Sequence, residues 1–175
     1  MTHIHRTTLA ALLACGLFAC DSGVEPAPAA SVQLDANFNA GTHGWLADFT
    51  DFPEGEREKH QVESGHRALP QPLDTTRRGY MLSGMNHSDD MFMYIRRRVT
   101  GLFPDTDYDI GFRVTLATDA PAGCAGVGGA PGESVVLKAG AAAAEPVPVV
   151  RDGDYRLDVD KGEQLEEGTA ALILG

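Results

Sequence analysis

The expected fold class rests on one stretch of the chain, Tyr108-Asp109-Ile110-Gly111-Phe112-Arg113-Val114-Thr115-Leu116. Apolar side chains occupy every second position, and the positions between them are polar or Gly. In a β-strand this alternation puts the two sets on opposite faces, whereas a helix would spread them around its circumference. The pattern therefore predicts a half-buried strand whose apolar side chains face a core. These side chains are Tyr108, Ile110, Phe112, Val114 and Leu116.

A second strand is expected just before this one, over residues 91–99, which are rich in Met, Phe, Tyr, Ile and Val. The connection over 100–107 contains Gly101, which permits positive φ, and Pro104, which cannot donate to a sheet. This is turn chemistry between two strand patterns, so the two strands are expected to pair antiparallel. Leu102 is expected to fold beneath the turn and cap the core.

Short strand patterns separated by turn residues recur along the rest of the chain. Strands or extended segments are expected at 32–38, 45–49, 80–83, 134–139, 146–150, 155–159 and 170–174. Asp152-Gly153 is a strong hairpin signal. The polar stretch 51–67 is expected to be mostly exposed loop and edge, with a strand around Glu58–Glu63 as the alternative. Beyond residue 20 no segment has a helical period of useful length. The sequence therefore predicts an all-β, antiparallel β-sandwich.

Composition excludes some classes of partner. The chain has 175 residues, enough for one domain with a core, a net charge of −11 and a pI of about 4.8. Nucleic acid requires clustered Lys and Arg to neutralise phosphates, so no nucleic-acid partner is predicted. The acidic balance equally disfavours adhesion to anionic lipid through basic charge.

The first 19 residues predict a lipoprotein signal peptide. The apolar run over 9–19 is too short to span a bilayer, which takes ~20 residues, but suits the central region of a signal peptide. It leads into Leu17-Phe18-Ala19-Cys20, which resembles the lipobox of bacterial lipoproteins. The resemblance implies cleavage before Cys20, lipidation of its thiol, export, and anchoring to the inner or outer bacterial membrane. The alternative is an ordinary signal peptide in which Cys20 is incidental.

The mature chain is expected to consist of a tether and one domain. Residues 20–31 are rich in Pro and Ala after Cys20, and the folded domain is expected over 32–175. The chain stops within the apolar run 170–174, which is either the closing strand or a sign that the sandwich lacks its last strands. In the second case, the first strand at 32–38 would keep an unpaired edge that favours association.

The densest group of functional side chains lies in the loop 84–90, which contains Asn86, His87, Ser88, Asp89 and Asp90. Such side chains bind sugar hydroxyls, coordinate a cation or transfer protons. The alternative is a loop whose Asn, Ser and Asp side chains bond their own backbone. The letters match neither a calcium loop nor a motif for a catalytic triad. We therefore predict a ligand site formed by these five residues with Glu133, and assign no catalytic residue.

Other single residues carry weaker signals. Trp45 is either a sugar-stacking platform or a core residue beside Phe38 and Phe49, and the second interpretation is favoured. The four histidines outside the signal peptide, His43, His60, His66 and His87, lack the tight spacing of metal ligands. No metal and no cofactor is predicted.

Two resemblances extend this interpretation. The order Val99-Thr100-Gly101-Leu102, followed by Pro104, Thr106 and Tyr108, resembles a hairpin common in jelly-roll sandwiches of the galactose-binding-like and carbohydrate-binding types. A larger pattern, Gly44-Trp45 with the 86–90 and 128–134 segments, resembles a group of uncharacterised bacterial lipoproteins. The first resemblance implies a jelly-roll fold, and the second implies no particular activity.

Two functions remain open. The first is a non-enzymatic binding or structural module of the cell envelope, in the periplasm or outside the cell, with carbohydrate or another envelope protein as its partner. The second is an envelope hydrolase acting on polysaccharide, with Asp89, Asp90 or Glu133 as carboxylates and His87 assisting. Two carboxylates about 5–10 Å apart across an open cleft would favour the hydrolase.

Overall fold

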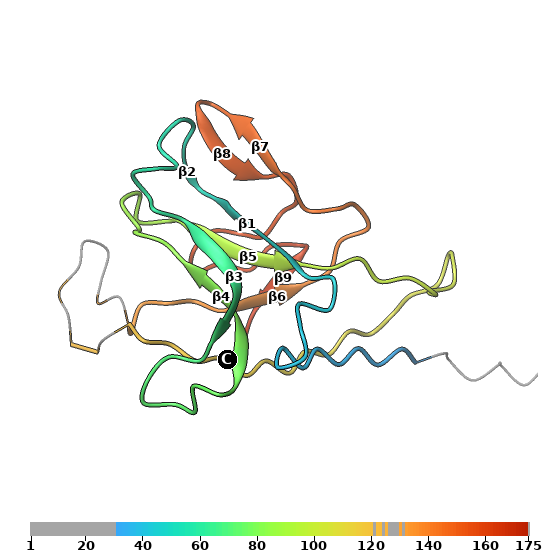
Figure 1. Cartoon of the computed structure of the whole chain (residues 1–175). Coiled ribbons are helices and arrows are strands. Elements are labelled where there is room, and N and C mark those ends of the chain that lie inside the picture. The colour runs from blue at the N-terminus through green and yellow to red at the C-terminus, as the bar shows by residue number, and fades with distance from the viewer. Residues whose placement is uncertain (1–30, 121, 124, 126–129, 131, 175) are drawn as a thin grey trace, which may run out of the picture. The chain divides into compact units, whose positions relative to one another are not determined.

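The computed structural model describes residues 31–120, 122–123, 125, 130 and 132–174. Within these residues β-strands are the only regular secondary structure, and all of them fall in one compact unit, Gln33–Gly175. The strands are β1 (Leu46–Thr50), β2 (Phe52–Pro53), β3 (Glu63–Ala68), β4 (Arg78–Ser83), β5 (Phe92–Arg96), β6 (Lys138–Gly140), β7 (Pro148–Arg151), β8 (Asp154–Leu157) and β9 (Ala171–Ile173) (Figure 1). Every pairing is antiparallel, so the prediction of an all-β, antiparallel protein is confirmed.

The strands form four small sheets (Figure 1). β1 pairs with β5, β3 with β4, and β6 with β9, while β8 lies between β2 and β7 in the three-stranded sheet. β1 also contacts β7 and β8, and β4 contacts β5. Among the described residues, no helix is long and apolar enough to cross a membrane.

The core centres on the end of β1 and the start of β2. Phe49 and Phe52 are the buried hydrophobic side chains of the described residues, at 2% and 1% exposure. Phe49 lies opposite Met93 in the β1–β5 register, and Phe52 lies opposite Tyr155 of β8. Alternation over 45–49 predicted this strand, which starts one residue later than expected.

The β7–β8 hairpin forms as its turn residues predicted. Asp152 and Gly153 both have positive φ, 53° and 86°, as a two-residue type I′ turn requires. The turn brings Arg151 opposite Asp154 and Val150 opposite Tyr155. Along β8, Tyr155 and Leu157 are half-buried on one face, whereas Arg156 on the opposite face is exposed.

The prediction of a strand over 108–116 is wrong. No strand is formed there, and Ile110, Phe112, Val114 and Leu116 are 57%, 45%, 56% and 57% exposed. Alternation shows only that a segment suits a strand; a sheet also needs a neighbour with free hydrogen-bonding groups. The expected neighbour, β5, ends at Arg96 and pairs with β1 on one edge, and residues 108–116 do not return along its other edge, which has no paired strand among the described residues. Leu102 likewise caps no core, since it is 46% exposed.

Residues 32–38 form no strand, so that expectation is wrong. The stretch 51–67 holds exposed loop and a strand, β3, which begins at Glu63, later than the alternative strand around 58–63; it also contains β2 and three buried side chains that were not expected. These buried side chains are Asp51, Phe52 and His60. The expected strand over 134–139 is shorter and later, as β6, and the apolar run at 170–174 forms β9, which pairs with it.

Candidate functional site

The loop between β4 and β5 is held in shape by Asn86. Its side-chain amide Nδ2 donates to the carbonyl oxygen of Asp89 at 2.7 Å, and its Oδ1 accepts from the backbone N of Met91 at 3.2 Å. These bonds close the loop on itself, as Asn side chains commonly do in turns. For Asn86, the interpretation as a structural residue therefore fits the geometry.

Ser88 attaches this loop to the core. Its hydroxyl donates to the backbone oxygen of Asp51 at 2.7 Å, across 37 positions of sequence. Asp51 lies between β1 and β2, directly after the buried Thr50, and has a positive φ of 65°. Its own backbone N donates to the oxygen of Tyr155 in β8 at 2.7 Å. The loop is thereby connected to two sheets at once.

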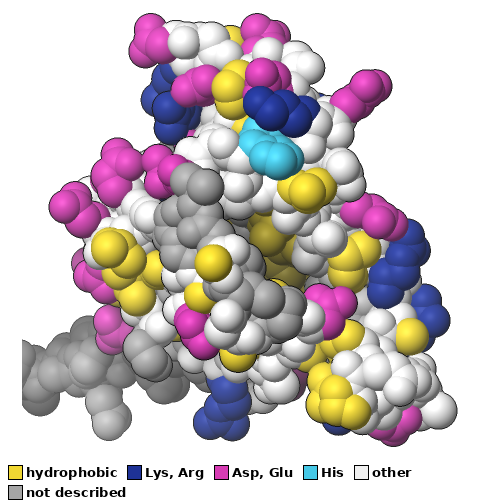
Figure 2. Space-filling view, turned by 90° about the vertical axis from the view of Figure 1, so that its left-hand side faces the viewer, with side chains coloured by type: hydrophobic (Ala, Val, Ile, Leu, Met, Phe, Trp, Pro, Cys, Tyr) yellow, Lys and Arg dark blue, Asp and Glu magenta, His cyan; other side chains and the backbone are white. Residues whose placement is uncertain are grey.

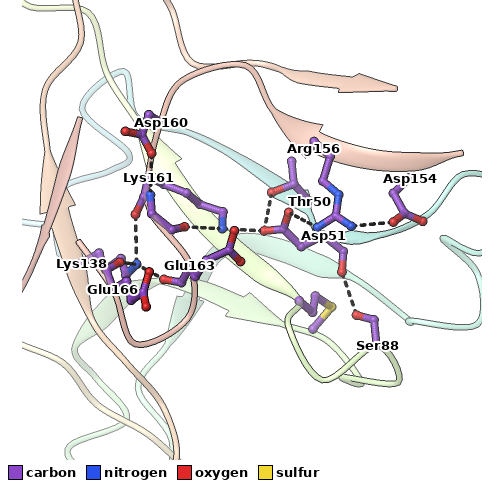
Figure 3. Close-up of polar contacts among 12 residues, drawn as sticks. Thr50, Asp51, Ser88, Lys138, Asp154, Arg156, Asp160, Lys161, Glu163 and Glu166 are labelled. Carbon is purple, nitrogen blue, oxygen red and sulfur yellow. Dashed lines mark hydrogen bonds and ion pairs between the residues drawn. The ribbon is translucent and has the colours of Figure 1, made fainter. Parts of the chain in front are cut away.

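The Asp51 side chain is the centre of a buried ion-pair cluster (Figure 3). It is 4% exposed; its Oδ1 lies 3.3 Å from Nη1 of Arg156, and its Oδ2 lies 2.9 Å from Nζ of Lys161. Arg156 also pairs with Asp154 at 2.7 Å. A carboxylate removed from water must find such partners, because an unpaired buried charge is strongly destabilising. Both carboxylate oxygens of Asp51 are paired with cations, so Asp51 is a structural residue.

An aromatic layer supports the same loop. The His60 ring is 1% exposed, and its centroid lies 4.8 Å from that of Phe52 and 5.6 Å from that of His87. His60 Nδ1 donates to the carbonyl oxygen of Met85 at 2.9 Å, and the backbone N of Met85 donates to the carbonyl oxygen of His60 at 2.7 Å. The His87 ring is therefore placed edge-on against a buried, hydrogen-bonded imidazole.

Three side chains of the predicted set remain available to a ligand. His87, Asp89 and Asp90 are exposed, and their side chains make no hydrogen bond or ion pair with other described residues. Asp89 has a positive φ of 67°, a conformation that Asp and Asn tolerate better than most residues. Asn86 and Ser88 thus fix the backbone, while the residues between and after them present imidazole and carboxylate groups to solvent.

Glu133 does not join this group. It is exposed, and its Oε1 accepts a hydrogen bond from the backbone N of Gly123 at 3.2 Å. Within the part of the chain that the structure describes, no hydrogen bond or ion pair connects Glu133 with residues 86–90. The lipidation candidate Cys20 lies outside the described residues.

The remaining histidines and Trp45 have local roles. His43 Nε2 donates to Asn37 O at 2.7 Å, and His66 Nε2 donates to Phe38 O while its Nδ1 accepts from Arg78 Nε at 3.4 Å. In residues 31–120 and 132–174, no three His, Cys, Asp or Glu side chains are grouped so that they could hold a metal ion. Trp45 is half-buried and is not among the buried core side chains, and its buried Nε1 has no hydrogen-bond partner among the described residues.

A polar and aromatic cluster on β1 and β5 was not anticipated from the sequence. The rings of Phe92 and Tyr94 stack at 5.5 Å, and Arg96 pairs with Glu145 at 3.1 Å and Asp48 at 3.5 Å. Burial, with the Asp48 charge, raises the pKa of Tyr94 to about 12, so its hydroxyl stays protonated at neutral pH. It donates to Pro146 O at 3.4 Å. The period-2 spacing of Phe92, Tyr94 and Arg96 was the available signal.

The side chain of Lys138, in β6, extends into the loop that follows β8 (Figure 3). Its Nζ donates to the backbone oxygens of Lys161 at 3.0 Å, Glu166 at 2.6 Å and Glu163. Burial, with the nearby Lys161 charge, lowers the pKa of Lys138. The ammonium group satisfies carbonyl groups that the loop cannot pair internally, so this cluster is structural.

Comparison of the chain with protein-family models, with curated proteins and with solved structures finds no match. Sequence reasoning located the exposed loop but missed the two buried residues that support it. Asp51 had a usable signal, because it lies between Phe49 and Phe52 in an otherwise strand-like run, whereas nothing in the surrounding letters marks His60 as buried.

Proposed function

We propose that this protein is a lipid-anchored, non-enzymatic binding module of the bacterial cell envelope that takes carbohydrate as its ligand through the loop 84–90. The observation that supports this proposal is the contrast within the loop. Asn86 and Ser88 are tied to the backbone, Ser88 to that of Asp51, while His87, Asp89 and Asp90 stay exposed. Functional side chains on a loop held by a rigid framework are a common arrangement for binding.

The chemistry of the three exposed side chains favours a neutral, hydroxyl-rich ligand. Carboxylates accept hydrogen bonds from hydroxyl groups, and an imidazole can donate or accept. A polyanion would be repelled by two adjacent carboxylates on a chain of net charge −11. Carbohydrate meets this requirement, and it is abundant where a lipoprotein of the envelope would be exposed.

The finer fold and the anchor belong to the same proposal. The chain is all-β with short antiparallel sheets, and the jelly-roll class is proposed for it on the sequence resemblance of residues 99–108, although these residues form no hairpin in the structure. The Leu17-Phe18-Ala19-Cys20 run supports lipidation of Cys20, with residues 20–31 as the tether and the domain in the periplasm or outside the cell.

A glycan array tests the ligand class. The chain carrying His87→Ala, Asp89→Asn and Asp90→Asn should lose the glycans that the unmodified protein binds, with its melting temperature nearly unchanged. Asn is chosen because position 89 has positive φ. The matched control is Asp105→Asn with Asp107→Asn, which removes the same two charges from another exposed loop where Asp105 also has positive φ, 50°.

Equal binding by both variants would contradict the proposed site, and unfolding of the first variant would show that its residues are structural. Release of reducing sugar ends by the unmodified protein, lost in the first variant alone, would show that the protein is a hydrolase and not a binding module.

Anchoring is tested separately: Cys20→Ala should release the protein from the membrane fraction and abolish palmitate labelling, and Cys124→Ala should do neither. Export of the unmodified protein without label would contradict lipidation.

A further inference from the structure

Residues 108–116 leave both their backbone and one apolar face unused. None of them makes a backbone hydrogen bond to the backbone of another described residue. Ile110, Phe112, Val114 and Leu116 are each 45–57% exposed. Exposed hydrophobic side chains are common in this protein, and Figure 2 shows them at several places on the face that corresponds to the left-hand side of Figure 1. An extended segment with free donors and acceptors is a template for strand pairing.

This segment is complementary to itself in one antiparallel register. When two copies pair around Gly111, position i lies opposite position 222 minus i of the other copy. Asp109 then faces Arg113 of the second copy, and Arg113 faces Asp109 of the second copy. Opposite charges directly across a sheet are favourable, and the two-fold axis makes the pair twice.

The apolar face matches in the same register. Ile110 lies opposite Phe112 of the second copy, and Tyr108 lies opposite Val114, each of them twice. Pairs of aromatic and β-branched side chains are among those that stabilise antiparallel strands. A register shifted by one residue would oppose apolar to polar faces. A shift by two residues keeps apolar side chains opposite one another, but only the register centred on Gly111 also pairs Asp109 with Arg113, so the charges select this alignment.

Space for these side chains exists next to the segment. A hollow of about 430 Å³ is lined by Ile110 and Phe112 on one side and by residues of β6 and β9, including Ala139, Leu172 and Ile173, on the other. In the paired register, Phe112 and Ile110 of the second copy project from the same face as Ile110 and Phe112 of the first. They are therefore directed toward the same hollow.

We propose that the protein forms a two-fold homodimer in which residues 108–114 of two copies pair as antiparallel strands around Gly111. Backbone donors, apolar side chains and charges that are unused within one described chain all find partners in the second. This inference does not depend on the carbohydrate site, because it uses none of residues 84–90.

Charge exchange tests the register with the full-length chain in a mild detergent, by sedimentation equilibrium. Asp109→Arg alone, or Arg113→Asp alone, places like charges opposite each other and should raise the dissociation constant about tenfold. The double variant should restore it to within about twofold. Within one extended strand the two residues lie roughly 13 Å apart, too far to form a pair, so rescue requires the second copy.

Cross-linking tests the centre of the register. Gly111→Cys, in a chain with Cys15, Cys20 and Cys124 replaced by Ser, should form a disulfide-linked dimer under mild oxidation. Residues directly opposite in a sheet have Cα atoms within disulfide range. Position 111 tolerates a side chain, since its φ is not positive and an added Cβ would meet nothing within 4 Å. Thr115→Cys is the control, because its copies would lie roughly 27 Å apart.

A chain that stays monomeric at all concentrations would overturn the proposal, and so would failure of the double variant to recover. Equal cross-linking at positions 111 and 115 would also overturn it, since that result indicates random collision. An unchanged dissociation constant in Asp109→Arg would overturn it as well, because it would show that another surface is used.

Discussion

Asp51 is the residue on which the candidate site depends most directly. Its backbone oxygen holds Ser88, and its carboxylate, 4% exposed, neutralises Arg156 and Lys161. Removing one member of a buried ion pair leaves an uncompensated charge, which costs more than the pair contributes. The stability of the loop 84–90 thus depends on a residue that lies outside the proposed ligand site.

The first prediction follows from this burial. Asp51→Asn should lower the free energy of unfolding by about 3 kcal/mol, the low end for breaking a buried pair, because Arg156 is 45% exposed. Asp154→Asn removes a carboxylate from the same Arg156 but at a 31% exposed position, and should cost under about 1 kcal/mol. Urea melts measure both. Equal losses would contradict the central role of Asp51.

Among the elements, the β7–β8 hairpin depends on its turn. Gly153 has a φ of 86°, and an added Cβ would meet nothing within 4 Å, so only the backbone resists substitution. Gly153→Ala should therefore cost about 1–2 kcal/mol. Gly111→Ala, at an open position without positive φ, should be neutral or stabilise by up to about 1 kcal/mol. If Gly153→Ala left the free energy of unfolding unchanged, the turn would not be type I′.

The loop between β8 and β9 is held by hydrogen bonds to a carboxylate, and these bonds depend on pH. The Asp160 carboxylate accepts from Thr169 N at 2.9 Å, Gly162 N at 3.0 Å and Thr169 Oγ1 at 3.0 Å, and these bonds lower its pKa from the ordinary 3.8. A lowered pKa in the folded state means that this stabilisation is present above pH ~4 and lost as the pH falls through the folded value.

NMR titration checks this prediction. The amide signals of Gly162 and Thr169 should shift together at a midpoint below pH 3.8, and the transition should be absent in Asp160→Asn. The Thr76 amide, which donates to Asp74 in a separate loop, should keep its own acid transition in that variant. A midpoint above 3.8 would contradict the hydrogen-bonded geometry.

The whole molecule has a small core for its length. Phe49 and Phe52 are the buried hydrophobic side chains of the described residues, whereas sixteen large hydrophobic residues there are exposed. The denaturant dependence of unfolding scales with the surface that unfolding newly exposes. In urea, at concentrations where the protein is monomeric, the slope m should therefore lie near or below about 1 kcal/mol/M. Trp45 fluorescence can report it, and a slope of 2 or more would show that these side chains are covered in solution.

Local sequence signals determined the fold class and several of its parts. Turn residues specified the Asp152-Gly153 hairpin, because the backbone of two consecutive positions needs positive φ and few residues allow it. Alternation located β1 and β8, strand-forming composition located β5, and the polar residues of 84–90 marked an exposed loop. In each case the information lies within a few neighbouring residues.

Only the tertiary structure decided which strands pair and which polar residues are buried. The clearest alternating segment, 108–116, forms no strand, because a strand needs a neighbour to pair with and none of the described strands lies in register beside it; β5 pairs with β1 alone. Asp51, within a stretch that is acidic and polar by composition, is buried because Arg156 and Lys161, more than 100 positions away, neutralise it. Burial and pairing are properties of contacts between remote residues, and local composition does not contain them.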